Sequence, residues 1–371
     1  MKNIVILAMG GTIAGAGEQG KDIGYKSGAI KAQTLIDAIP ELKNVANICV
    51  EQVCNINSDD VTSEIWIALA KRIEELLQRN DVDGIVIMHG TDTMEETAFF
   101  LSLTLDGFGS RVVGNVADES VGCSGVVGNV AKPVILTGSM RPATATEPDG
   151  PANLLFAVKS AVDLCERSVR ESPNSALSCP PPSGHHLLVN AENTAGVYVA
   201  FAGKLMNARS VQKIHANDLD AFAELSCSPT TCHAREGGHL PLEKAFDISN
   251  MRELPHVSVL YFNADADAEL VRFAAERSAG LVIAGAGAGE FSREWADALS
   301  DVVSKNKIPV VISTRINRGR IVPEQLLVPG TIAAYDLPPA KAAVLLRLAL
   351  IVTTAPAAIQ KFFETSYTLS S

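Results

Sequence analysis

The chain has 371 residues, enough for two domains or one large one, and its 31 basic and 42 acidic residues give a net charge of −11. This acidic balance argues against nucleic acid or an anionic membrane as the main partner, and 47% hydrophobic residues exclude disorder for most of the chain. The longest apolar runs, such as residues 343–352, are about half the length that spans a bilayer, and Met1 leads into a strand-like run without a signal-peptide region. We therefore expect a cytoplasmic enzyme.

Strand-length apolar runs alternate with helical patterns along the first half of the chain. Continuous apolar runs at residues 4–9, 82–88 and 134–137 are typical of strands buried on both faces of a parallel sheet. Amphipathic patterns predict helices at 63–78, 91–105 and 151–163. Segments 107–131 and 165–195 break the pattern and are predicted to be loop insertions. The first contains Val112-Val113-Gly114-Asn115-Val116, which returns fourteen residues later.

The alternation resumes after a second break. Strands are expected at 257–261, 280–284 and 309–314, and helices at 268–278, 293–305 and 338–352. The whole pattern predicts an α/β protein with a larger, doubly wound N-terminal domain (1–225) whose sheet is mainly parallel. A linker (226–246) then leads to a smaller Rossmann-like C-terminal domain (247–371).

Cysteines, histidines and glycines predict neither a metal nor a cofactor. The seven cysteines are odd in number and sparse, so no disulfide framework is implied. Cys227, Cys232, His233 and His239 cluster together, but their spacing matches no zinc pattern, and His185-His186 is typical of a solvated loop. Residues 285–289 resemble a weak dinucleotide loop and are interpreted as a tight turn.

Two polar motifs directly follow buried strands. Gly10-Gly11-Thr12-Ile13-Ala14-Gly15 lets the chain turn tightly at the carboxyl edge of the sheet, where open α/β folds bind ligands. His89-Gly90-Thr91-Asp92-Thr93 follows a second strand, and Asn57-Ser58-Asp59-Asp60 precedes the helix at 63–78. Helix capping accounts for Thr91 or Asp92 but hardly for both, and is as good an interpretation as binding for residues 57–60. A threonine nucleophile would need a base or relay, for which Tyr25, Thr91 and Asp92 are available.

Together these segments resemble the bacterial-type L-asparaginase family, which includes the glutaminase-asparaginases. The matching stretches are GGTIAG (10–15), residues 25–28, EQVCNINSDDVT from Glu51, DGIVIMHGTDTMEETAFFL from Asp83, KPVILTGSMRPATATEPDGPANLL from Lys132, FDISNMRELP from Phe246 and PAKAAVLLRLAL from Pro339. The resemblance covers nearly the whole chain apart from the interruptions. It implies hydrolysis of L-asparagine to L-aspartate and ammonia through an acyl-enzyme, with possible side activity on L-glutamine and without a cofactor.

The resemblance also implies roles for individual residues. Thr12 matches the family nucleophile, Tyr25 its activating hydroxyl on a lid, and Thr91 and Asp92 the second threonine and its acidic neighbour. Ser58 and Asp59 match residues that hold the α-carboxylate and α-amino group of the substrate, with Asp59 in place of the usual Gln or Glu. Gly11, Gly90, Thr91 and Asp92 complete the expected substrate-binding set.

The family lysine is expected to be missing. Counted without a gap along the helix after Asp149-Gly150-Pro151, Asp163 matches the acidic residue before the lysine and Leu164 falls on the lysine itself. Lys159 would lie on another helix face, and Arg167 could substitute only after a backbone shift. A homologue that binds asparagine or aspartate with impaired turnover is therefore the alternative function. A tRNA-dependent amidotransferase subunit is disfavoured because the chain starts at the first strand.

Residues from a neighbouring subunit are also expected at the site. By resemblance, Asp265 aligns with a family residue that reaches the active site of another subunit, and Glu324 is a second candidate in a less certain register. The family assembles as a tetramer built from two tight dimers, so a homotetramer is predicted here.

Overall fold

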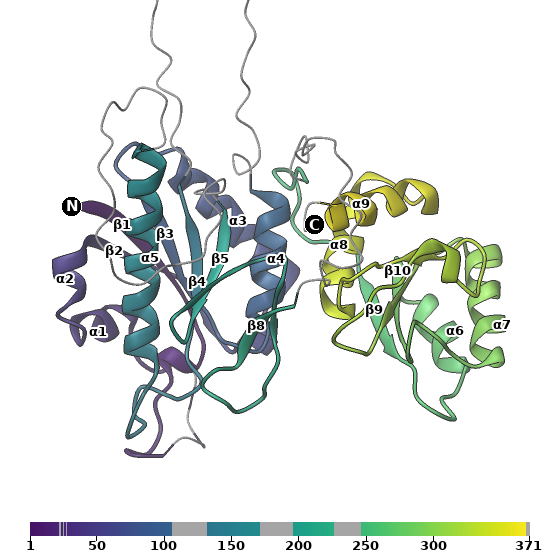
Figure 1. The fold of residues 1–371 in the computed structure, drawn as a ribbon, viewed down its shortest axis with the longest axis horizontal. Helices are drawn as coiled ribbons and strands as arrows, with labels where there is room; N and C mark the ends of the chain where they lie inside the picture. The colour runs from purple at the N-terminus through teal and green to yellow at the C-terminus, as the bar shows by residue number, and fades with distance from the viewer. Residues whose placement is uncertain are drawn as a thin grey trace, which may run out of the picture.

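The computed structural model describes residues 1–21, 24, 26, 28–105, 132–170, 196–225 and 246–368. These residues form two α/β units that lie side by side, each with helices packed on a central sheet (Figure 1). The α/β class with a larger N-terminal and a smaller C-terminal unit is confirmed. The predicted linker 226–246 falls almost wholly outside the described residues, so the exact domain boundary stays a prediction.

The larger sheet has the order β2-β1-β3-β4-β5-β6. Its first five strands are parallel and β6 pairs antiparallel with β5. The central strands consist of apolar side chains because both faces of the sheet are covered. The strands span Lys2–Gly10 (β1), Ala46–Ile56 (β2), Gly84–Met88 (β3), Val134–Thr137 (β4), Val197–Phe201 (β5) and Lys204–Asn207 (β6).

Helices on opposite faces complete this unit. Helix α5 (Gly150–Arg170) lies on one face with the short helices α1 (Ala32–Asp37) and α2 (Leu42–Val45). Helices α3 (Ser63–Leu77) and α4 (Met94–Thr104) pack on the other face (Figure 1). A stripe at helical spacing on α5 faces the sheet and is buried: Leu154, Ala157, Val158, Ala161 and Leu164.

The smaller unit has a four-stranded parallel sheet in the order β12-β11-β10-β9. Its helix α8 (Pro339–Val352) packs on this sheet and also against α4, so it lies between the two units (Figure 1). The remaining elements are β9 (Val257–Tyr261), α6 (Glu269–Ala275), β10 (Gly280–Gly285), α7 (Arg293–Asp301), β11 (Val310–Thr314), β12 (Ile332–Ala333) and α9 (Pro356–Thr368).

Two features differ from the sequence-based expectation. Helix α5 continues to Arg170, so the predicted loop from residue 165 is wrong for 165–170; Cys165 is buried there and its thiol donates to the Asp83 carbonyl oxygen. A separate two-stranded hairpin, β7 (Val211–Lys213) and β8 (Phe222–Glu224), follows β6 and was not predicted. Segments 106–131 and 171–195 lie outside the described residues. Within the described part, no helix is long and apolar enough to cross a membrane.

The packing of α5 predicts the effect of a lysine at position 164. Leu164 is 2% exposed within the apolar core, so Leu164→Lys would bury an unpaired ammonium and should destabilise the fold by about 3–5 kcal/mol. Ala152→Lys on the exposed face of the same helix should change stability by less than about 0.5 kcal/mol. Urea unfolding of both variants measures the difference, and equal stabilities would contradict the assigned packing of α5.

Candidate active site

Three loops meet at the carboxyl edge of the larger sheet. They follow β2, β1 and β3, which are neighbours in that order, so the ends of these strands bring the loops together. The loops enclose a cavity of about 240 Å³. It is lined by Gly11, Thr12, Asn57, Ser58, Asp59, Gly90 and Asp92. Most of the residues proposed from sequence as substrate-binding thus line a single cavity.

The absence of side chains at two glycines permits this convergence. Gly11 has a φ of +77°, and a Cβ there would lie 2.6 Å from the Gly90 backbone. A Cβ on Gly90 would in turn lie 2.7 Å from Ser58 Oγ. Gly11 therefore packs against the Gly90 backbone and Gly90 against the Ser58 side chain, which leaves no room for a Cβ at either position.

Ser58 connects the loop after β2 to the loop after β3. Its buried hydroxyl accepts a hydrogen bond from the Asp92 N–H at 3.2 Å, and Thr93 Oγ1 donates to the Ser58 carbonyl oxygen at 2.7 Å. Helix α4 starts at Met94 and α3 at Ser63, and neither has a side-chain cap, so capping does not explain these polar residues. Their hydrogen bonds instead fix the two loops around the cavity.

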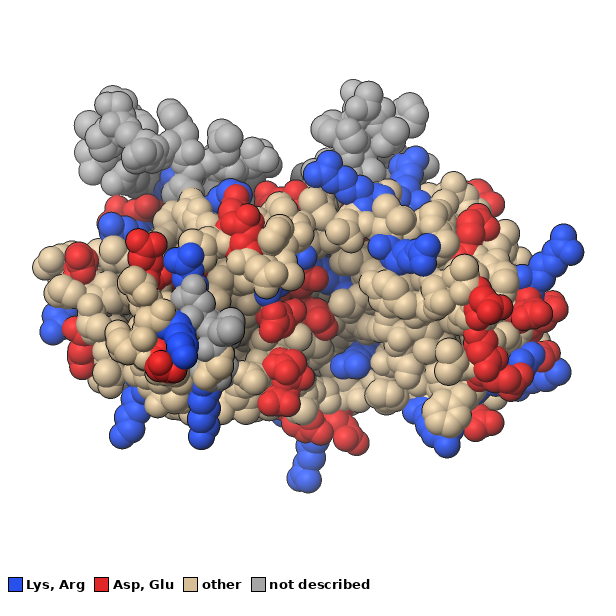
Figure 2. Space-filling view, turned by 90° about the horizontal axis from the view of Figure 1, so that it is seen from below, with Lys and Arg blue, Asp and Glu red and all other residues tan. Residues whose placement is uncertain are grey.

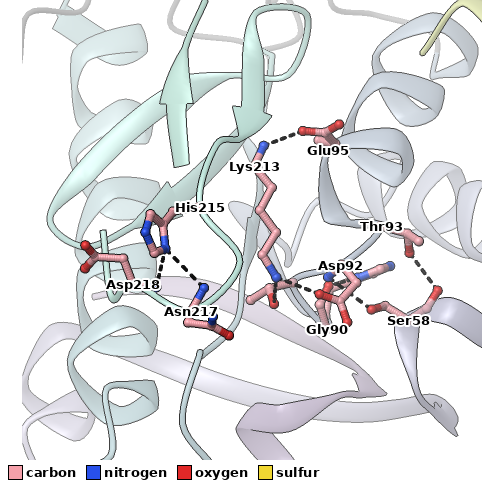
Figure 3. Close-up of polar contacts among 11 residues, drawn as sticks. Ser58, Gly90, Asp92, Thr93, Glu95, Lys213, His215, Asn217 and Asp218 are labelled. Atoms are coloured by element: carbon pink, nitrogen blue, oxygen red, sulfur yellow. Dashed lines mark hydrogen bonds and ion pairs between the residues drawn. The ribbon is translucent and has the colours of Figure 1, made fainter. Parts of the chain in front are cut away.

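Lys213 supplies a cation to this cluster. Its Nζ donates to Thr91 Oγ1 at 2.9 Å and to Asp92 Oδ1 at 2.6 Å, and its backbone N–H donates to the Glu95 carboxylate (Figure 3). The Lys213 side chain is 14% exposed, whereas that of Asp92 is 68% exposed. The lysine thus approaches from the protein side and the carboxylate faces solvent.

The expectation that no cation lies beside Thr91 is therefore wrong. Leu164 belongs to the core face of α5, whereas the lysine beside Thr91 is Lys213 on the β7–β8 hairpin. Counting along one helix could not reach it because the hairpin follows segment 171–195 and two further strands. The only local signal is the short alternation Val211-Gln212-Lys213 between turn-forming segments.

A buried polar network lies behind the Gly90 loop. The His89 imidazole is neutral, because its burial lowers its pKa to about 4. The Gly90 carbonyl oxygen can only accept, so His89 Nδ1–H donates to it at 2.7 Å. His89 Nε2 then carries no hydrogen and accepts from the Thr97 hydroxyl at 3.0 Å, whose oxygen accepts from Trp66 Nε1 at 2.8 Å. This network orients the peptide group that precedes Thr91.

Other predicted residues lie apart from the cavity or outside the described chain. Tyr25 is not among the described residues. Asp265, with a φ of +62°, and Glu324 are exposed in the smaller unit and do not line the cavity. The clustered Cys227, Cys232, His233 and His239, and also His185-His186, lie outside the described residues. Within the part of the chain that the structure describes, no three His, Cys, Asp or Glu side chains form a potential metal site.

Comparison with known proteins gives matches along most of the chain. The family model "Asparaginase, N-terminal" matches residues 3–117, 120–170 and 186–243, and "Glutaminase/Asparaginase C-terminal domain" matches 256–363. L-asparaginase 2 of Bacillus subtilis is 34% identical, covering 98% of this chain and 86% of the relative. A protein of Haemophilus influenzae named probable periplasmic L-asparaginase is also 34% identical, covering 98% and 93%.

A solved structure shows the same arrangement. The crystal structure of a probable cytoplasmic L-asparaginase from Campylobacter jejuni has a TM-score of 0.77 and 33% identity to this chain. The match covers 98% of this chain and 100% of that structure. Both α/β units are therefore shared with a solved protein.

The contact between Gly90 and Ser58 predicts that no side chain is tolerated at position 90. Gly90→Ala would place a Cβ 2.7 Å from a buried, hydrogen-bonded hydroxyl and should destabilise the fold by about 1–3 kcal/mol. Gly203→Ala is the control for backbone strain alone, since it has a φ of +73° and no atom within 4 Å; it should cost about 1–2 kcal/mol. Denaturant unfolding measures both costs, and a Gly90→Ala protein as stable as the wild type would contradict the close contact with Ser58.

Two buried groups predict opposing contributions to stability in acid. Unfolded His89 gains a proton near pH 6.5 and folded His89 only near 4, so acidification between these values removes up to about 3 kcal/mol. Burial and then the neighbouring Glu95 raise the pKa of Glu96 to about 7, so folded Glu96 keeps a proton between pH 4.5 and 7 that the unfolded chain releases. Acidification through that range therefore adds about 3 kcal/mol.

The contributions of His89 and Glu96 should nearly cancel in the wild type, and each should become visible when the other residue is replaced. Relative to the wild type, Glu96→Gln should lose stability as the pH falls from 6.5 to 4.5, whereas His89→Gln should gain stability over the same range. Chemical denaturation at a series of pH values provides the measurement. Parallel pH profiles of the three proteins would be incompatible with these shifted pKa values.

Proposed function

Because the chain belongs to the asparaginase family, we propose that it hydrolyses L-asparagine to L-aspartate and ammonia through an ester formed on Thr12. The observation that carries this proposal is the position of Thr12 in a cavity shared with Gly90 and Asp92, beside the Thr91–Lys213 hydrogen bond. A nucleophilic hydroxyl and a second, cation-linked hydroxyl on adjacent strand ends are the groups that a two-step amide hydrolysis needs.

In the first step the Thr12 oxygen attacks the side-chain carbonyl carbon of asparagine. The carbon–oxygen bond forms, the carbon–nitrogen bond breaks, and the proton from the hydroxyl leaves with the nitrogen as ammonia. Tyr25 is proposed as the hydroxyl that relays this proton. The glycine-rich backbone at Gly11 lets the loop approach the substrate closely, because no side chain covers it.

In the second step water attacks the Thr12 ester, and Thr91 with Lys213 is proposed to activate it. Thr91 Oγ1 accepts a hydrogen bond from the Lys213 ammonium, which leaves the Thr91 hydroxyl hydrogen directed away from the lysine. The ammonium stabilises negative charge that develops on Thr91 as its hydroxyl proton moves to the leaving Thr12 oxygen and a proton from water replaces it. Water adds its oxygen to the acyl carbon, the ester bond breaks, and Thr12 regains its proton.

The charges around the cavity fit an amino-acid substrate. Asp59 and Asp92 both line the cavity and are exposed, and we assign them to the α-ammonium group. Ser58 Oγ accepts from the Asp92 N–H, so its own hydrogen is available to the α-carboxylate. The loop after β1 lies at the lower edge of Figure 1. Figure 2 views the molecule from below and shows acidic side chains gathered near the middle of that face. Such a face attracts the ammonium group of an incoming amino acid.

The alternative of impaired turnover loses its basis, since it depended on a missing cation and Lys213 provides one. Side activity on L-glutamine, a cytoplasmic location and a homotetramer with Asp265 or Glu324 reaching a neighbouring site stay predictions. None of the proposed steps uses a metal or an organic cofactor.

Three variants test the proposed chemistry. Thr12→Ala should abolish ammonia release from L-asparagine, and Lys213→Met should lower kcat by roughly 10²–10⁴-fold because it removes the cation that supports proton transfer. Lys204→Met is the control: Lys204 pairs with Asp220, is 49% exposed and does not line the cavity, so kcat should stay within about twofold.

Coupled detection of ammonia and aspartate distinguishes the outcomes. Folded wild-type protein that releases neither product would refute the proposed function. Wild-type rates in Thr12→Ala would refute the assigned nucleophile while leaving the reaction intact.

A further inference from the structure

A lysine of the smaller unit is buried against the segment that carries Lys213. Lys341 lies on α8, is fully buried, and directs its Nζ at three backbone carbonyl oxygens. It donates to Ala208 at 2.9 Å, to Arg209 at 3.0 Å and to Val211. An ammonium group has three N–H donors, so these carbonyls satisfy all of them. Residues 208–211 are thereby fixed to α8, and strand β7, which starts at Val211 and ends at Lys213, continues directly from them.

The hairpin that carries Lys213 has little support of its own. Strands β7 and β8 have three residues each and form a two-stranded sheet of their own. Such a short isolated hairpin is marginal in water. The position of Lys213 Nζ must therefore be set by contacts with other elements.

Three contacts with α4 and with the smaller unit hold this strand. Glu95 on α4 accepts the Lys213 backbone N–H, which ties the strand to the helix that follows Thr91. Lys341 of the smaller unit binds the backbone carbonyls of Ala208, Arg209 and Val211. The Arg209 side chain also forms a buried ion pair with Asp336 of the smaller unit. Together they fix the strand between α4 and α8.

Building on the proposed function, we propose that Lys341 is a positioning residue for the hydrolytic step. Its three hydrogen bonds fix residues 208–211 and so keep Lys213 Nζ against Thr91 and Asp92. The smaller unit thus supports the site through Lys341. Among the described residues, none of its side chains lines the cavity.

The charges around Lys341 fit this role. Burial lowers its pKa, while the carboxylates of Glu95, Asp336 and Glu96 act in the opposite direction and Arg209 adds to the lowering. The Phe99 ring lies 5.5 Å from Nζ and excludes water on that side. A cation in such a place is retained only if its hydrogen bonds are satisfied, and here the backbone before β7 satisfies them.

A double-mutant cycle tests the proposal. Lys341→Met should lower kcat for L-asparagine by roughly 10–100-fold, the scale expected when a reacting group is displaced by about 1 Å, with KM changed less than about threefold. In a Lys213→Met background the same substitution should cause no further loss, because there is no ammonium left to position. Multiplicative losses in the double variant would overturn the proposal.

A matched lysine controls for general loosening between the two units. Lys71 on α3 donates to the Met251 carbonyl oxygen at 3.0 Å, so it also binds a backbone carbonyl distant in sequence. Neither Lys71 nor Met251 is close to β7 in the chain. Lys71→Met should leave kcat within about twofold. If Lys341→Met does not fold, Lys341→Arg retains the charge but its planar fork cannot converge on three carbonyls, so kcat should still fall.

Hydrogen exchange separates failure of the inference from failure of the proposed function. Amides of residues 209–213 should exchange at least tenfold faster in Lys341→Met than in the wild type, and at wild-type rates in Lys71→Met. This readout needs no activity, so a wild type without asparagine hydrolysis would refute only the proposed function. Unchanged exchange at 209–213 would refute the positioning role even if kcat fell.

Discussion

The contact between Lys213 and the Thr91–Asp92 pair is the interaction on which the site depends. It joins a short hairpin to the loop after β3 through one side chain, at 2.9 and 2.6 Å. Because the ammonium is largely buried, it needs acceptors, and the Asp92 side chain that it contacts faces solvent. The strength of this contact therefore comes from the precision with which the backbone presents Lys213, more than from the ion pair itself.

That precision comes from buried charges between the two units. Glu95 and Glu96 open helix α4, and Lys341 and Arg347 lie on α8, which packs against it. Burial raises the pKa of both carboxyl groups and lowers that of both bases, so ionisation of each group is resisted by its surroundings. A buried set of this kind contributes little net stability, but removal of one member leaves an opposite charge buried without its partner, which is costly. The set therefore favours the observed packing of α4 against α8, on which the position of the Lys213 strand depends.

The sequence alone predicted the strands and the position of the cavity at the sheet edge, but it did not predict the hairpin that carries Lys213. Short apolar runs such as residues 134–137 are typical of strands covered on both faces, and glycines directly after β1 and β3 locate the cavity. Lys213 could not be found by the same reasoning, because three residues of β7 carry too little periodicity. Its partners, Thr91, Asp92 and Glu95, are set by tertiary contacts alone. Leu164 falls at the lysine position only if that lysine is sought on α5, whereas Lys213 lies on β7.

The two acidic residues that line the cavity also affect release of the product. Asp59 and Asp92 line the same cavity, which suits one ammonium group and one neutral amide. Hydrolysis converts that amide into a second carboxylate, so the proposed product carries one more negative charge than the proposed substrate. The two carboxylates repel this charge, while Lys213 is already engaged by Asp92 and Thr91 and compensates it only in part. The arrangement that attracts asparagine therefore favours departure of aspartate, and the exposed Asp92 provides this repulsion at the mouth of the cavity, where the product leaves.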